Sequence, residues 1–73
     1  MPKLPRVTPR KFIAALLRQG FFVDRQQGSH VVMLHADGRR AIVPLHARDI
    51  PLRTFSGILG DIGWSSEDLR NFL

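Results

Sequence analysis

The pattern of hydrophobic and polar positions predicts a first helix over residues 8–20. Its apolar side chains recur at helical spacing and form one stripe, made of Phe12, Ile13, Leu16 and Leu17. Thr8 is a suitable N-cap, Pro9 suits the first helical position, and Gly20 suits the left-handed residue that ends a helix.

Three short segments rich in aromatic and β-branched residues follow, at residues 21–25, 30–34 and 40–44. Short glycine-containing stretches separate them, as is typical of hairpin connections, so the pattern predicts an antiparallel meander. Pro44 cannot donate a hydrogen bond to a neighbouring strand. It should therefore end the third strand or lie at an edge.

Residues 51–63 are predicted to form a second helix, because apolar side chains recur there at i, i+3, i+4 and i+7 and Gly63 can close it. Gly57 and Gly60 each weaken this helix by about 1 kcal/mol relative to alanine. Two interpretations of these glycines remain open: they permit close approach of another element, or they are only tolerated.

A short last helix is predicted from Ser65 and Asp68, which form a capping-box pattern, with Trp64 at the corner between the two helices. The order is α-β-β-β-α plus a short helix, which is an α+β fold. A three-stranded antiparallel sheet with helices on a single face is the natural two-layer arrangement. Residues 8–73 then form one domain, and residues 1–7, with two prolines and no periodicity, form an N-terminal arm.

The middle strand carries apolar side chains on both faces of the predicted sheet. One face has His30, Val32 and Leu34, and the other has Val31 and Met33. A sheet with one solvated face should instead alternate cleanly between apolar and polar residues. An apolar open face indicates a protein partner, and the alternative is that loops and the arm cover it.

The charge distribution adds a polyanionic partner to this picture. Residues 1–53 hold ten Lys and Arg against three Asp and Glu, a net +7, whereas residues 54–73 hold one against three, a net −2. Such a basic body indicates nucleic acid, although a solvated basic surface would give the same count. The first helix would either extend an RNA-binding surface or present a solvated face with Arg10, Lys11 and Arg18.

Composition disfavours several classes of protein. There is no cysteine for a disulfide framework or a thiolate zinc site, and no apolar run of about 18 residues for a membrane span. No signal-peptide pattern follows the N-terminus, so we expect a cytoplasmic protein. His30 and His35 would point to opposite faces of a strand, so they cannot share one metal ion, and no carboxylate or thiolate completes a set of ligands. We therefore expect no metal site, and we also expect no cofactor. Phosphate-cradling P-loops and GxSxG elbows are also missing.

His30 is the candidate catalytic residue. RNA brings its own nucleophile, the 2′-hydroxyl, and its cleavage requires a base, an acid and cations but no metal ion. Imidazole both takes and gives a proton near neutral pH, which suits this chemistry. A histidine at the start of a strand is also often structural or merely exposed, and composition does not decide between these roles.

Residues close to His30 are candidates for substrate binding. Gly28 allows close approach of the backbone, and Ser29 offers a hydroxyl to a phosphate or to the ring. Candidate phosphate contacts are Arg25, Arg39 and Arg40. His46 is a candidate substrate contact and second proton-transfer group, or else a loop histidine that caps the end of a strand.

Four features occur in order over residues 8–72: an amphipathic helix ending in "QGFFVDRQ", then "QGSH", "IVPLH" and "TFSGILGDIGWSSEDL". As a set they resemble the HicA-type toxins, the small mRNA interferases of bacterial toxin–antitoxin pairs. The resemblance implies a fold similar to double-stranded-RNA-binding domains and metal-independent cleavage of mRNA. It also implies that the histidine of the GSH step, here His30, is essential, and that a HicB-type antitoxin covers the active site.

Two other functions remain open from the sequence. A non-catalytic RNA-binding module of the double-stranded-RNA-binding type would bind RNA in a salt-dependent manner and yield no product. A purely protein-binding subunit would show no affinity for RNA at low salt.

Overall fold

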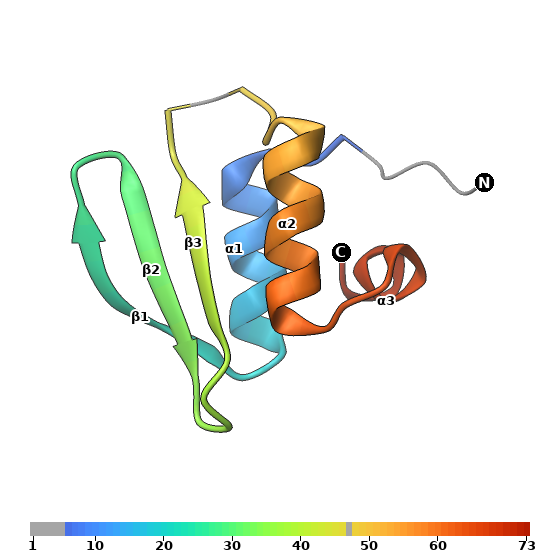
Figure 1. Ribbon diagram of the computed structural model, residues 1–73, viewed down its shortest axis with the longest axis horizontal. Coiled ribbons are helices and arrows are strands. Elements are labelled where there is room, and N and C mark those ends of the chain that lie inside the picture. Colours follow the sequence, from blue (N-terminus) through green and yellow to red (C-terminus); the bar gives the residue numbers. More distant parts are fainter. Residues whose placement is uncertain (1–5, 47) are drawn as a thin grey trace.

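The computed structural model describes residues 6–46 and 48–73, which form a three-stranded sheet with two long helices on one face (Figure 1). The elements are α1 (Pro9–Arg18), β1 (Phe21–Gln27), β2 (His30–His35), β3 (Arg40–Pro44), α2 (Leu52–Ile62) and α3 (Ser66–Phe72). The sheet is antiparallel with the strand order β1-β2-β3. The predicted α-β-β-β-α order and the short last helix are confirmed.

Local sequence signals set the ends of α1 as predicted. The Thr8 hydroxyl accepts a hydrogen bond from the Lys11 backbone N–H at 3.2 Å, and Gly20 follows the helix with a φ of +91°. The predicted apolar stripe is wrong at Leu17, which is 50% exposed. At 100° per residue Leu17 lies far round the helix from the buried side, and the small Ala15 occupies that side instead.

The first hairpin is tighter than predicted. Gln26 and Gln27 pair with Val31 and His30, so β1 runs two residues past its predicted end. Only two residues, 28 and 29, are left for the turn. Gly28 has a φ of +57°, and positive φ at the first central residue alone is the pattern of a type II′ hairpin turn.

A β-bulge interrupts the pairing of β1 with β2. The register shifts by one residue between Val23 and Arg25, which leaves Asp24 as the extra residue. Arg25 therefore pairs with Val32, whereas a regular ladder would have placed it opposite Val31. Val31 packs in the core, so the bulge turns Arg25 to the face of the sheet away from the helices, which we call the outer face.

The core lies between the sheet and the helices. Its largest fully buried side chains are Val7, Phe12, Leu16, Met33, Val43, Phe55, Ile62 and Leu69. The rings of Phe12 and Phe55 meet edge to face with centroids 4.9 Å apart. Trp64 is buried between the end of α2 and the start of α3, with its ring 4.8 Å from that of Phe72, which confirms the predicted corner position.

The helices after the sheet also begin and end as their sequences predict. Gly63 closes α2 with a φ of +73°, and Ser65 and Asp68 form the reciprocal capping box of α3 at 3.0 Å in both directions. A Cβ atom added at Gly57 or Gly60 would meet no atom within 4 Å. Of the two interpretations of these glycines, the structure therefore supports simple tolerance.

The N-terminal segment enters the core at Val7. This side chain is buried, and its carbonyl accepts a hydrogen bond from the Ile50 backbone N–H at 3.1 Å. The preceding Arg6 is exposed, and the remainder of the predicted arm, residues 1–5, lies outside the described residues. This segment therefore joins the start of α1 to the loop before α2.

The centre of the outer face of the sheet is apolar, as the alternation in β2 predicts. Val32 at its centre is only 4% exposed, while Phe22 and Ile42 on the flanking strands are 49% and 43% exposed. No described loop therefore covers this face fully. No helix in the described part of the chain is long and apolar enough to span a membrane.

Candidate functional site

One end of the sheet gathers segments that are far apart in the sequence. The start of β2 lies beside the end of β3 because the two strands are antiparallel. Helices α1 and α2 both begin at this same end (Figure 1). The β1–β2 turn and the loop that leads into α2 complete it.

A pocket of about 380 Å³ opens at this end. Its lining comes from β2, β3, the following loop and the first turn of α2, and consists of His30, Ile42, Pro44, His46, Pro51 and Thr54. The predicted residues His30 and His46 thus meet in one cavity. Pro51 and Thr54 were not predicted from the sequence, because their approach to His30 depends on the tertiary structure.

Backbone pairing brings the two histidines together. His30 lies opposite Pro44, and the Leu45 N–H donates to the Ser29 carbonyl at 2.6 Å, which extends the ladder past the end of β3. His46 comes next, on the same side as Pro44 by the alternation of a strand. The two imidazole centroids are 6.2 Å apart with an interplanar angle of 73°. Both side chains belong to exposed residues, and neither ring has a hydrogen-bond partner among the described residues.

The first turn of α2 faces the pocket with two of its residues, Pro51 and Thr54. Pro51 is the N-cap residue and makes no side-chain hydrogen bond to the turn. The first backbone N–H groups of a helix without such a cap, together with the positive end of the helix dipole, favour a bound anion. The electrostatics of this end therefore suit a phosphate group beside the imidazoles.

The turn residues Gly28 and Ser29 position the start of β2. Gly28 occupies a left-handed conformation, and its carbonyl accepts a hydrogen bond from the Gln26 side-chain amide at 3.1 Å. Ser29 is half-buried and contributes its carbonyl to the contact with Leu45. Both residues thus hold the backbone that carries His30, and neither lines the pocket.

Arg25 and Arg40 lie on the same face of the sheet as His30. Arg25 pairs with Val32, two residues along β2, and Arg40 pairs with Leu34, which is about 13 Å along the strand at the usual rise per residue. Arg25 is exposed and has a loose 3.8 Å contact with the Asp24 carboxylate. An exposed pair of this kind contributes little, so both guanidinium groups are available to a ligand on this face.

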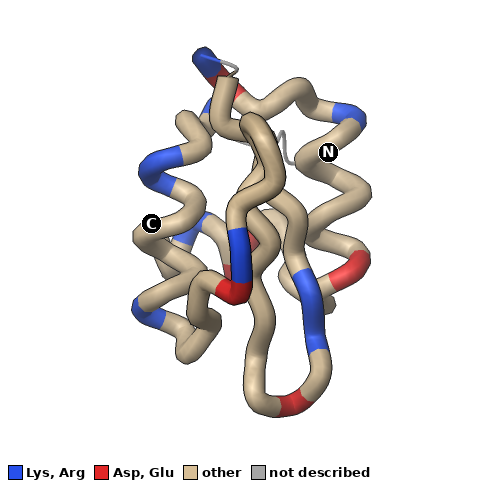
Figure 2. Tube along the Cα trace, turned by 90° about the vertical axis from the view of Figure 1, so that its left-hand side faces the viewer, with Lys and Arg blue, Asp and Glu red and all other residues tan. Residues whose placement is uncertain are grey.

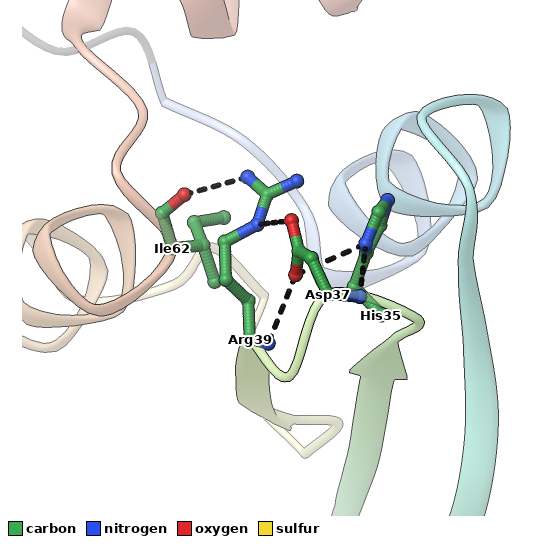
Figure 3. A network of polar contacts seen from close by, with 4 residues as sticks. All are labelled: His35, Asp37, Arg39 and Ile62. Carbon is green, nitrogen blue, oxygen red and sulfur yellow. Dashed lines mark hydrogen bonds and ion pairs between the residues drawn. The ribbon is translucent and has the colours of Figure 1, made fainter.

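Arg39 points elsewhere and is held within the fold (Figure 3). Its Nε donates to Asp37 at 2.8 Å, its Nη1 donates to the Ile62 carbonyl at 2.8 Å, and its guanidinium lies 5.1 Å from the centroid of the Phe21 ring. The Ile62 carbonyl belongs to the last turn of α2, where helix carbonyls lack partners within the helix. Arg39 therefore ties the β2–β3 hairpin to the end of α2, away from the pocket that contains His30.

Asp37 organises the tip of this hairpin. Its pKa is lowered from the ordinary value of 3.8, first by the backbone hydrogen bond from Arg39 and further by the Arg39 side chain and by His35, while burial acts in the opposite direction. His35 Nδ1 lies 3.1 Å from the Asp37 backbone N–H and 3.0 Å from its carboxylate. The neutral ring accepts from the N–H, and the protonated ring donates to the carboxylate. His35 is thus engaged structurally on the helix side of the sheet.

Basic residues outside this face lie on the helices and in the loops (Figure 2). Arg10 lines a shallow cavity together with Arg48, for which the sequence pattern predicts no role. Lys11 and Arg18 line a different cavity, and Arg18 donates to the Phe72 carbonyl at 2.6 Å. This cavity therefore has one arginine from the beginning of α1 and one from the loop that carries His46.

Among the described residues, no three of the His, Asp and Glu side chains lie close enough together to hold a metal ion. His30 and His35 lie at opposite ends of β2, as its bounds require.

A family model described as the HicA toxin of bacterial toxin–antitoxin systems matches residues 9–64. The chain belongs to the HicA toxin family. Membership makes it the toxin member of a toxin–antitoxin system and implies an antitoxin partner. The match runs from the start of α1 to Trp64, so in this HicA chain it contains the whole pocket with its two histidines, and leaves α3 outside. Comparison with individually curated proteins gives no match.

Proposed function

We propose that this HicA-family chain is a metal-independent endoribonuclease that cleaves mRNA in the cytoplasm, with His30 as a proton-transfer residue. The position of His30 carries the proposal. Its side chain is exposed, lines a pocket and makes no hydrogen bond among the described residues. A histidine kept for structural reasons would be engaged by its neighbours, as His35 is by Asp37.

The reaction begins when the ribose 2′-hydroxyl attacks the adjacent phosphate. Negative charge grows on the phosphate oxygens as this bond forms, and positive groups aimed at them lower the barrier. Arg25 on the outer face and the first turn of α2 are the groups that would supply this stabilisation. Gly28 and Ser29 would act by holding the backbone of His30, and Arg40 by binding a more distant phosphate.

A HicB-type antitoxin would inhibit the enzyme by covering the outer face and the pocket together. Ile42 supports this arrangement because it lines the pocket and is also 43% exposed on the sheet. Phe22 extends the same apolar surface on β1. A partner that buried these two side chains would block access to His30.

The test is cleavage of 5′-labelled mRNA by the purified protein in excess EDTA. Wild type should yield fragments with 2′,3′-cyclic phosphate ends, and His30→Ala should slow cleavage by about 10²–10⁴-fold, the usual contribution of an acid–base group. Gln27→Ala is the matched control, because Gln27 is the exposed partner of His30 in the ladder. Thermal unfolding and RNA binding at low salt should be unchanged in both variants.

Continued cleavage by a clean preparation of His30→Ala would reject the proposed role. Salt-dependent RNA binding by the wild type with no product at any enzyme concentration would instead support the non-catalytic RNA-binding module.

A further inference from the structure

The second imidazole of the pocket has no role in the reaction described so far. His46 lies in the loop after β3, and its ring centroid is 6.2 Å from that of His30. Both rings line the same cavity and neither donates to or accepts from a described residue. A loop histidine that capped the end of a strand would show such a hydrogen bond, so the capping interpretation has no support.

Backbone hydrogen bonds anchor the chain on either side of His46 in the sequence. The Leu45 N–H donates to the Ser29 carbonyl at 2.6 Å, directly beside the pair formed by His30 and Pro44. The loop then returns to Ile50, whose N–H donates to the Val7 carbonyl at 3.1 Å. His46 is therefore presented from an anchored segment to the same space as His30.

We propose that His46 is the second proton-transfer residue of the ribonuclease site and acts as a pair with His30. This inference rests on the proposed function. Cleavage requires one proton to leave the 2′-hydroxyl and another to reach the 5′-oxygen, and two separate groups perform these transfers without waiting for solvent. Two imidazoles that line one cavity fulfil this requirement.

The proton balance of the paired reaction is complete without any further reactant. The neutral imidazole takes the 2′-hydroxyl proton as that oxygen bonds to phosphorus, and the P–O5′ bond breaks as the imidazolium gives its proton to the leaving oxygen. The products are a 2′,3′-cyclic phosphate and a 5′-hydroxyl. The two rings have then exchanged protonation states, and proton exchange with water restores them.

The other charged side chains on the surrounding elements would contribute no titration near neutral pH. They are Asp24 and Arg25 on β1, Arg40 on β3, Arg48 and Asp49 in the loop before α2, and Arg53 and Asp61 in α2. The third imidazole, His35, lies at the far end of β2 from His30, beside Asp37. Arginine stays protonated, and aspartate ordinarily titrates near pH 4. Imidazole is the side-chain type that titrates between pH 5 and 8. The active state has one ring protonated and one neutral, so activity should fall on both sides of an optimum.

The first test compares kcat against pH for wild type, His46→Ala, His46→Gln and His30→Ala. Wild type should give a bell-shaped profile. Each His46 variant should lose about 10²–10⁴-fold in kcat with little change in KM, and should lose one limb of the profile. Glutamine keeps polar contacts but cannot transfer a proton, so a purely structural role would leave His46→Gln active with both limbs intact.

The second test uses RNA with sulfur in place of the leaving 5′-oxygen at a mapped cleavage site. A thiolate leaves without protonation, because a thiol is much more acidic than an alcohol. The variant that lacks the general acid should recover most of its activity on this substrate, whereas the variant that lacks the general base should not. If activity on this substrate recovers in one of the two histidine variants and not in the other, the result supports His30 and His46 as an acid–base pair.

Two results separate the failure of this inference from failure of the proposed function. If His46→Gln keeps kcat within about threefold while His30→Ala is inactive, the second residue is wrong and the ribonuclease assignment stands. If His30→Ala and wild type cleave equally, both fail.

Discussion

Two glycines inside α2 should limit the stability of the protein without serving its structure. Gly57 and Gly60 have helical backbone conformations, and a Cβ atom on either would meet no atom within 4 Å. Replacement by alanine should therefore add the difference in helix propensity, about 0.8–1 kcal/mol at each position. The double variant should gain about 2 kcal/mol in the free energy of unfolding, which for a domain of this size raises Tm by about 8–15 °C.

Urea unfolding followed by circular dichroism at 25 °C measures this gain, with the slope against urea expected to stay unchanged. Gly63→Ala is the matched control. It also meets open space, but its φ of +73° disfavours any residue with a Cβ, so this substitution should cost about 1 kcal/mol or more. If the double variant at Gly57 and Gly60 is no more stable than wild type, the reasoning is refuted. That result would mean that a methyl group at one of these positions does meet a neighbouring atom, against the open space seen in the structure.

The positions of Arg39, Arg25 and Asp37 lead to different expectations for stability, RNA binding and pH dependence. Arg39→Met should cost about 1–2 kcal/mol in urea unfolding because the Ile62 carbonyl loses a charged donor, whereas Arg25→Met should leave stability within about 0.5 kcal/mol. Measured on the His30→Ala background, Arg25→Met should lower the slope of log affinity for RNA against log salt by about 0.7, and an unchanged slope would remove Arg25 from the phosphate contacts. The lowered pKa of Asp37 stabilises the fold above the unfolded pKa of an aspartate, about 3.9, and this contribution is lost as pH falls through the lower folded value. The stability difference between wild type and Asp37→Asn should thus persist above about pH 5 and vanish in stronger acid, and a difference that grew with acid would contradict it.

Elements whose limits are set by adjacent residues were predictable from the sequence. Thr8 and Gly20 bracket α1, and Ser65 and Asp68 start α3, because capping depends on side chains within three or four residues of the helix end. The apolar outer face followed from the alternation in β2 alone. These features require no knowledge of the tertiary structure.

Features that depend on distant segments were not predictable. The bulge at Asp24 changes which face Arg25 occupies, and no local signal in β1 marks it. Arg39 and Arg40 are neighbours in sequence and both looked available, yet the end of α2 engages only Arg39. Thr54 reaches the pocket through the loop after β3, whose course depends on contacts such as that between Ile50 and Val7.

Pro44 has a consequence for what can approach the pocket. The hydrogen bond next to it in the ladder joins Leu45 to Ser29, so the pair formed by Pro44 and His30 is not a hydrogen-bonded pair. The backbone nitrogen of Pro44 therefore points away from β2. Because β3 is an edge strand, this nitrogen faces the free edge of the sheet. Any other residue would present a donor there on which a foreign strand could begin to pair, and proline presents none. The entrance is therefore protected against sheet extension and the aggregation it brings, yet a flexible nucleic acid strand needs no such pairing to enter.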